Sequence, residues 1–237
     1  MDNRPIRYVK GVGETRGLKL EKLGIHTVGD LLRYFPRRYE DRGNVKNICD
    51  LAEGETCSII AAVSTPPTFH TAKNNLKYQR VFFADSTGTL LVTLFNRELT
   101  AKALAVGQKY RIFGKVVYGR LGLEIQSPVI ELYVPQGMKN IYPVYPLTAG
   151  ITSSLLVRII STLKEDILKI EDVLPDGVRE KYSLMPLSFA VMQMHFPTDL
   201  ENLKKAKETL AFTELLLFQI ALRGLKKEKE KQKAFAF

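Results

Sequence analysis

The sequence predicts an α+β fold in which helical segments lie on either side of a five-stranded barrel. Apolar residues recur at helical spacing near both ends, whereas residues 56–134 contain short apolar runs separated by turn residues. With 45% apolar residues in 237, the chain can bury one large core or two modest ones. We therefore expect a helical hairpin segment in residues 1–50, a barrel in 51–135, and a connector with further helices in 136–237.

Two short helices are expected within residues 9–36. Gly24 suits the end of the first helix, Thr27 is the expected N-cap of the second, and Pro36 ends it. The turn at Gly11 and Gly13 resembles that of helix-hairpin-helix modules, in which backbone N–H groups reach a DNA phosphate. A tight structural turn explains the same glycines equally well.

The short apolar runs in the middle of the chain predict five strands, at residues 57–64, 78–85, 89–96, 109–118 and 122–126. Residues 97–107 have helical propensity and end at a glycine. Three strands, a helix and two strands match the order of an OB-fold, a small barrel that often binds oligonucleotides.

The last third of the sequence begins with an extended connector, residues 135–150, in which prolines prevent a continuous helix. Helices are expected in residues 153–170, 187–196 and 199–233. The apolar face of the last helix is expected to run through Leu203, Ala206, Leu210, Leu217 and Ile220.

Alternation along the third barrel strand assigns its side chains to two faces. Its inward residues are expected to be Leu90, Val92 and Leu94, which turns Phe95 outward at the strand's end. If Val81 and Phe83 point inward on the second strand, the outward stripe there consists of Tyr78, Arg80 and Phe82. Such rings and cations can stack on bases and contact phosphates, although a helix or loop packed over Phe95 would make it ordinary packing.

The charge of the chain favours a polyanionic partner. The net charge is +10, and the candidates for phosphate contacts are Arg80, Arg97, Lys115 and Arg120. No catalytic or ATP-binding motif stands out: Val116 follows Gly114-Lys115 where a P-loop needs a hydroxyl.

Metal and membrane signals are also missing from the sequence. We expect His26, His70 and His195 to be structural, and Cys49 and Cys57 are too widely spaced for a metal or redox pair. No apolar run is long enough to span a bilayer, and the polar start of the sequence is unlike a signal peptide, so a cytoplasmic location is expected.

Together, these segments resemble the amino-terminal part of the RecG family, ATP-dependent helicases that act on stalled replication forks and Holliday junctions. The segments that carry the resemblance are residues 11–42, 85–96, 114–128, 142–148 and 195–222, of which "LLRYFPRRYEDR" and "LAFTELLLFQ" are the most specific. The resemblance implies a wedge domain on an OB-fold, which binds branched and single-stranded DNA and separates strands in repair and recombination. ATP and Mg²⁺ would belong to motor domains outside this chain, linked in cis, and the protein is expected to be a monomer.

In the family's pattern, two aromatic residues stack on unpaired bases at the fork. Phe95 matches the first position, but Leu99 occupies the second, which leaves no ring there. Arg97 could compensate through guanidinium stacking or a phosphate contact. Two alternatives stay open: a general single-strand-binding OB protein, and a protein-interaction scaffold.

Overall fold

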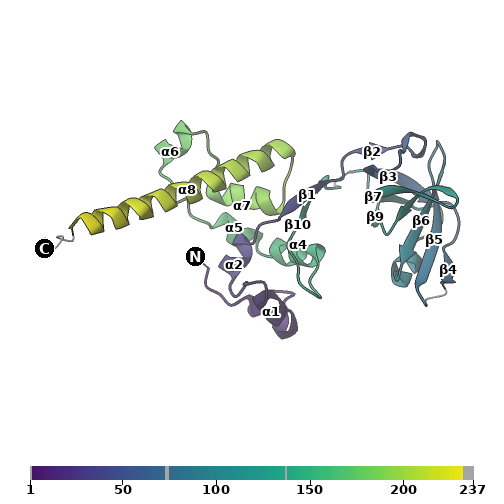
Figure 1. The fold of residues 1–237 in the computed structure, drawn as a ribbon, viewed down its shortest axis with the longest axis horizontal. Helices are drawn as coiled ribbons and strands as arrows, with labels where there is room; N and C mark the ends of the chain where they lie inside the picture. The colour runs from purple at the N-terminus through teal and green to yellow at the C-terminus, as the bar shows by residue number, and fades with distance from the viewer. Residues whose placement is uncertain (1, 73–74, 137, 232–237) are drawn as a thin grey trace, which may run out of the picture. The chain divides into compact units, whose positions relative to one another are not determined.

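The computed structural model describes residues 2–72, 75–136 and 138–231, which form two compact units. One unit consists of residues 41–140, and the other combines residues 1–40 with 141–237. Figure 1 labels most of their helices and strands. Each unit has its own hydrophobic core, and each is described separately below.

The barrel unit contains the five expected strands in OB-fold order. They are β3 (Thr56–Val63), β5 (Lys77–Ala84), β6 (Thr89–Phe95), β7 (Lys109–Gly119) and β8 (Gly122–Gln126). The hydrogen-bonded order β3-β5-β6-β8-β7 closes because β7 also pairs with β3. The helix α3 (Glu98–Lys102) lies between β6 and β7, which confirms the predicted order.

The barrel core confirms the alternation expected for two strands. Leu90, Val92 and Leu94 of β6 are buried in one cluster with Val81 and Phe83 of β5. In the described part of the barrel unit, the sequence analysis did not predict four further elements: β2 (Val45–Lys46), η2 (Ile48–Asp50), β4 (Thr68–Thr71) and β9 (Val129–Leu132). Strand β4 pairs only with β5 among the described strands, and it extends the sheet beyond the closed barrel.

The helical unit begins with the predicted hairpin. Its N-terminal elements are η1 (Ile6–Tyr8), α1 (Gly13–Glu21) and α2 (Val28–Arg33). Thr27 caps α2 through a reciprocal capping box with Asp30, because each side chain accepts from the other residue's backbone N–H. Gly24 has a φ of +77°, a conformation that glycine adopts without strain.

The rest of this unit follows the barrel in the chain. Its elements are β1 (Arg38–Asp41), which pairs with β10 (Ile141–Val144), and the helices α4 (Ser153–Ser161), α5 (Lys164–Leu168), α6 (Asp176–Lys181), α7 (Leu187–His195) and α8 (Leu200–Lys231). The helix expected in residues 153–170 is divided into α4 and α5, and the connector includes a strand.

One core joins the two separated parts of the helical unit. Leu20, Ile25 and Leu31 from the start of the chain pack with Leu156 and Ile160 from α4. This division differs from the expected segments 1–50, 51–135 and 136–237. Apolar residues that precede the barrel in the chain pack in one core with apolar residues that follow it, so both stretches belong to the same unit. The chain therefore leaves and re-enters this unit at residues 40–41 and 140–141.

His195 is a core residue of the helical unit. Its Nε2–H donates to the carbonyl of Leu32 at 2.9 Å, so its Nδ1 accepts from the hydroxyl of Tyr145 at 2.8 Å. Burial disfavours the imidazolium and lowers the pKa of His195 to about 4, with the Leu32 carbonyl opposing the shift.

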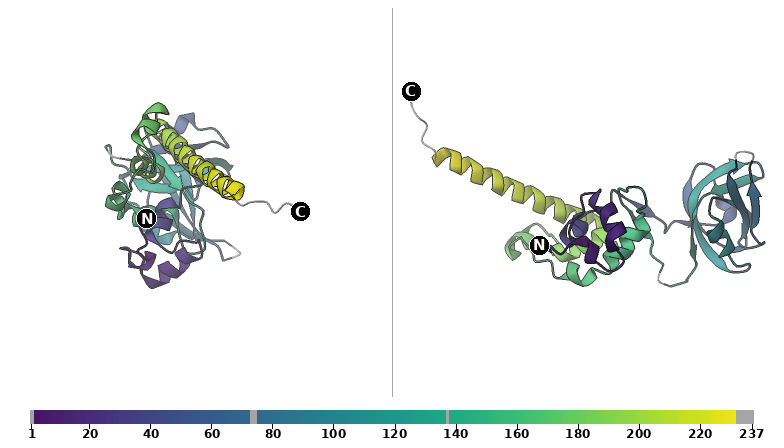
Figure 2. Two further views of the ribbon diagram at one scale, coloured as in Figure 1. Left: turned by 90° about the vertical axis from the view of Figure 1, so that its left-hand side faces the viewer. Right: turned by 90° about the horizontal axis from the view of Figure 1, so that it is seen from below.

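Helix α8 changes its environment along its length. Leu203 and Ala206 are buried against α7, as the predicted apolar face requires, but Leu217 and Ile220 are about half exposed. Figure 2 shows α8 continuing past the other helices of its unit, which explains this exposure. None of the helices in the described part of the chain has the length and apolar character needed to cross a membrane.

Candidate nucleic-acid interface

Phe95 and Tyr78 form the centre of the predicted site on the outer face of the barrel. They are cross-strand partners on β6 and β5, and both are half-buried. Their ring centroids lie 6.4 Å apart with the ring planes tilted by 50°. The register of β5 and β6 brings these two outward rings together, and each ring keeps part of its surface in solvent.

Strand β4 adds a third ring that the sequence analysis missed. His70 pairs with Tyr78, and the two rings stack at a centroid distance of 5.1 Å with planes 19° apart. His70, Tyr78 and Phe95 are called the aromatic row below. The alternation of "TFHT" in residues 68–71 is a weak strand signal, and it does not indicate which strand β4 pairs with.

Arg80 lies beside the aromatic row on β5. Its guanidinium carbon is 5.5 Å from the centroid of the Tyr78 ring, which is cation–π distance. Its buried Nε has no hydrogen-bond partner within the residues that the structure describes. Phe82, the next outward residue of β5, pairs with Leu91 and is half-buried.

The outer face of β6 is less open than the alternation suggests. Leu91 and Thr93 are both buried although they point away from the barrel core, and Thr93 donates to Glu124 of β8 at 3.3 Å. Of the other outward side chains of β6, Thr89 is exposed at its start and Phe95 is half-buried at its end. The accessible site therefore lies at Phe95, where β6 ends, and along β5 and β4.

Helix α3 holds the two predicted residues that follow Phe95. Arg97 is its N-cap residue and donates through Nη1 to the carbonyl of Pro128 at 2.6 Å. This hydrogen bond gives Arg97 a structural role, with its remaining N–H groups available for a phosphate. Leu99 lies on the first turn with 84% of its surface exposed, so the structure leaves an apolar side chain in solvent there.

The two remaining candidates for phosphate contacts lie outside the strands that carry the aromatic row. Lys115 is exposed on β7 opposite Thr56 of β3, and Arg120 is exposed in the turn between β7 and β8. Neither residue lies on β4, β5 or β6.

The glycine turn belongs to the other unit. Gly11 and Gly13 have φ values of +89° and +63°, which favour glycine, and both lie at the start of α1. A phosphate contact at this turn stays a prediction.

The aromatic row supplies the chemistry that unpaired nucleic acid needs. Ring faces stack on bases of any sequence, and the Arg80 cation can contact a phosphate or stack. The described residues around the row come from three neighbouring strands, so their spacing is held by backbone hydrogen bonds. A stacking role for Phe95 itself stays a prediction.

Comparison with known proteins agrees with the arrangement of strands and helices. Residues 5–168 match the RecG wedge domain family. The chain is 31% identical over 250 residues to the ATP-dependent DNA helicase RecG of Synechocystis sp., covering 98% of this chain and 30% of that protein. It is 34% identical over 235 residues to the ATP-dependent DNA helicase RecG of Streptococcus pneumoniae, covering 97% of this chain and 34% of the relative.

A solved structure gives the same result in three dimensions. The structure of RecG bound to a three-way DNA junction superposes with a TM-score of 0.85 at 30% identity, over 97% of this chain and 32% of that chain. The chain thus spans about a third of the length of the relatives it matches. On the family match and this structural similarity, the chain belongs to the RecG wedge domain family.

Proposed function

We propose that this chain binds branched DNA and keeps separated strands apart, as the wedge segment of a RecG-like ATP-dependent DNA helicase in DNA repair and recombination. The observation that carries the proposal is the aromatic row, with Arg80 beside it, on the outer face of an OB barrel. Membership of the RecG wedge domain family supports the same conclusion.

The energetics suit a segment that holds strands apart rather than one that drives unwinding. Opening one base-pair step costs about 1.4 kcal/mol, and stacking one base on an aromatic ring stabilises the complex by about 1–3 kcal/mol. One good stacking contact at Phe95 therefore offsets about one broken pair. Continuous unwinding needs ATP hydrolysis, for which we propose motor domains outside residues 1–237 that bind ATP and Mg²⁺.

We further propose that the protein acts as a monomer in the cytoplasm.

The net charge of +10 supports binding to a nucleic acid, because cationic side chains release counterions from DNA. Affinity should then fall as the salt concentration rises.

Fluorescence anisotropy with labelled DNA tests the proposal. The wild-type chain should bind a three-way junction more tightly than a linear duplex of the same total length. Phe95→Ala should weaken junction binding about 5- to 150-fold, the equivalent of one stacked base. Tyr118→Ala is the matched control, because it removes a ring that is 70% exposed on β7 of the same barrel.

Three results would contradict the proposal. Equal affinity for junction and duplex would remove the specificity for branched DNA. Stronger competition by oligothymidine than by junctions would instead indicate a general single-strand-binding protein, and weak binding to every DNA even at low salt would favour a protein-interaction scaffold.

A further inference from the structure

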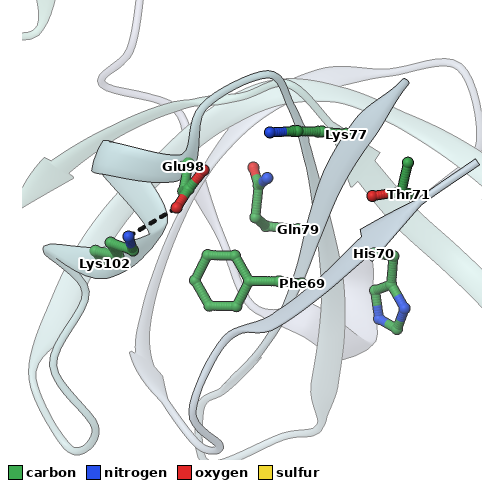
Figure 3. Close-up of a pocket in the computed structure, with 7 residues that line it drawn as sticks. All are labelled: Phe69, His70, Thr71, Lys77, Gln79, Glu98 and Lys102. Carbon is green, nitrogen blue, oxygen red and sulfur yellow. Dashed lines mark ion pairs between the residues drawn. The ribbon is translucent and has the colours of Figure 1, made fainter. Parts of the chain in front are cut away.

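A hollow lies on the opposite face of the β4–β5 ribbon from the aromatic row. It has a volume of about 280 Å³ and is lined by Phe69, His70, Thr71, Lys77, Gln79, Glu98 and Lys102. Cross-strand pairing explains its location: Phe69 pairs with Gln79, whereas the alternate pair of His70 and Tyr78 belongs to the row. Figure 3 shows Phe69 and Lys77 pointing toward α3, while the His70 ring points away.

Gln79 presents an unused acceptor in this hollow. The residue is only 2% exposed, and its Oε1 has no hydrogen-bond partner among the residues covered by the structure. Leaving a buried carbonyl oxygen unpaired costs about 1–3 kcal/mol, so such atoms usually meet a donor. In Figure 3 the carboxamide lies between the Phe69 ring and Lys77, on the side that faces α3. A ligand with an N–H group at this position would satisfy it.

Phe69 supplies a flat apolar surface beside that acceptor. Its side chain is on the edge strand β4, and 49% of its surface is exposed. An exposed ring next to a hydrogen-bonding amide suits a planar ligand that carries polar edge groups, as a nucleobase does.

The charges around the hollow favour an anion. Lys102 donates to Glu98 at 2.7 Å, and Lys77 adds a second cation, so the three side chains carry a net charge of +1. The hydrogen bond from Lys102 holds the pKa of Glu98 below its usual value, and the charge of Lys77 contributes to this shift. A phosphate attached to the bound group would therefore have a cation within reach.

We propose that this hollow binds one unpaired nucleotide of a DNA strand, separately from the aromatic row. The base stacks on Phe69, its exocyclic amino group donates to Gln79 Oε1, and the phosphate contacts Lys77. The inference rests on the proposed function only in requiring that the chain bind DNA. It implies a base preference, because cytosine carries an exocyclic amino group and thymine does not.

Binding of the octamers dC8 and dT8 to the full chain tests this proposal. The wild type should bind dC8 about 2- to 10-fold more tightly than dT8, the value of one hydrogen bond. Gln79→Leu should reduce this ratio to about 1 by removing the acceptor, with dT8 affinity unchanged. Leucine has a similar shape and no unpaired polar atom, so this variant should fold.

Phe69 provides an independent test through stacking. Phe69→Ala should weaken binding of both octamers about fivefold or more, and Phe69→Tyr should restore wild-type affinity because the ring is retained. Phe189→Ala is the matched control, since this ring is 42% exposed in the other unit.

The outcomes separate this proposal from the proposed function. An unchanged dC8 to dT8 ratio in Gln79→Leu, or wild-type affinity in Phe69→Ala, would overturn the nucleotide site, even if junction binding still depends on Phe95. Junction binding without any octamer binding would overturn it as well. Failure of the wild type to bind any DNA would overturn both proposals together.

Discussion

Replacing Leu99 with tyrosine should strengthen binding to branched DNA. We predict that Leu99 occupies the second of two stacking positions, and it lies on the first turn of α3 after Phe95. Since 84% of its surface is exposed, the substitution removes almost no packing. We expect the free energy of unfolding to change by about 0.5 kcal/mol or less, as is usual for surface substitutions.

The expected gain in affinity follows from stacking and its entropic cost. A ring stacked on an unpaired base contributes about 1–3 kcal/mol, and immobilising the new side chain costs about 0.5–1.5 kcal/mol. The midpoints of these two ranges differ by about 1 kcal/mol, which corresponds to a junction affinity about fivefold higher than that of the wild type.

Anisotropy titrations with a three-way junction and with a linear duplex would measure this gain. The increase should be confined to the junction, because a duplex offers no unpaired base. Val106→Tyr is the control: it adds the same ring at a 55% exposed position between α3 and β7. An equal gain in both variants, or none in Leu99→Tyr with the fold intact, would refute the assignment of Leu99 to a stacking position.

Two further predictions concern the stability of each unit. Because the folded-state pKa of His195 is about 4 against an unfolded value of 6.5, its neutral form stabilises the helical unit fully above pH 6.5. About 3 kcal/mol of this stability should be lost as the pH falls to about 4, and urea unfolding of His195→Gln should show a smaller loss. In the barrel, Glu131 accepts from the buried guanidiniums of Arg42 at 3.0 Å and Arg111 at 2.6 Å. Glu131→Gln should therefore lower the free energy of unfolding by about 3 kcal/mol, whereas Glu98→Gln, in an exposed ion pair, should have a much smaller effect. Equal losses in these two variants would contradict the role of burial.

The strands of the barrel could be predicted because their pattern is local. Alternation alone identified the inward residues of β6 and turned Phe95 to the outer face, whereas for β5 the structure decided that Val81 and Phe83 point inward. Thr27 and Gly24 marked helix ends for equally local reasons, a side-chain cap and a positive φ. The segments typical of the RecG family then identified the family, which the comparisons confirm.

The residues that complete each site depend on which strands pair and in which register, even though β4 and β5 are neighbours in the chain. His70 joined the aromatic row only because β4 pairs with β5 in a register that sets it opposite Tyr78. The same register places Phe69 beside Gln79, a polar residue on the inward side of β5 where alternation predicts an apolar one.

The sequence by itself thus determined the order of the OB-fold elements, the inward face of β6 and the family. The tertiary structure alone decided that residues on both sides of the barrel share one core, and that Leu91 and Thr93 are covered while Phe95 is partly open. Periodicity reports which face of an element is apolar, because it depends on neighbours along the chain. Which face meets which depends on contacts between residues far apart in the chain, and no local pattern records them.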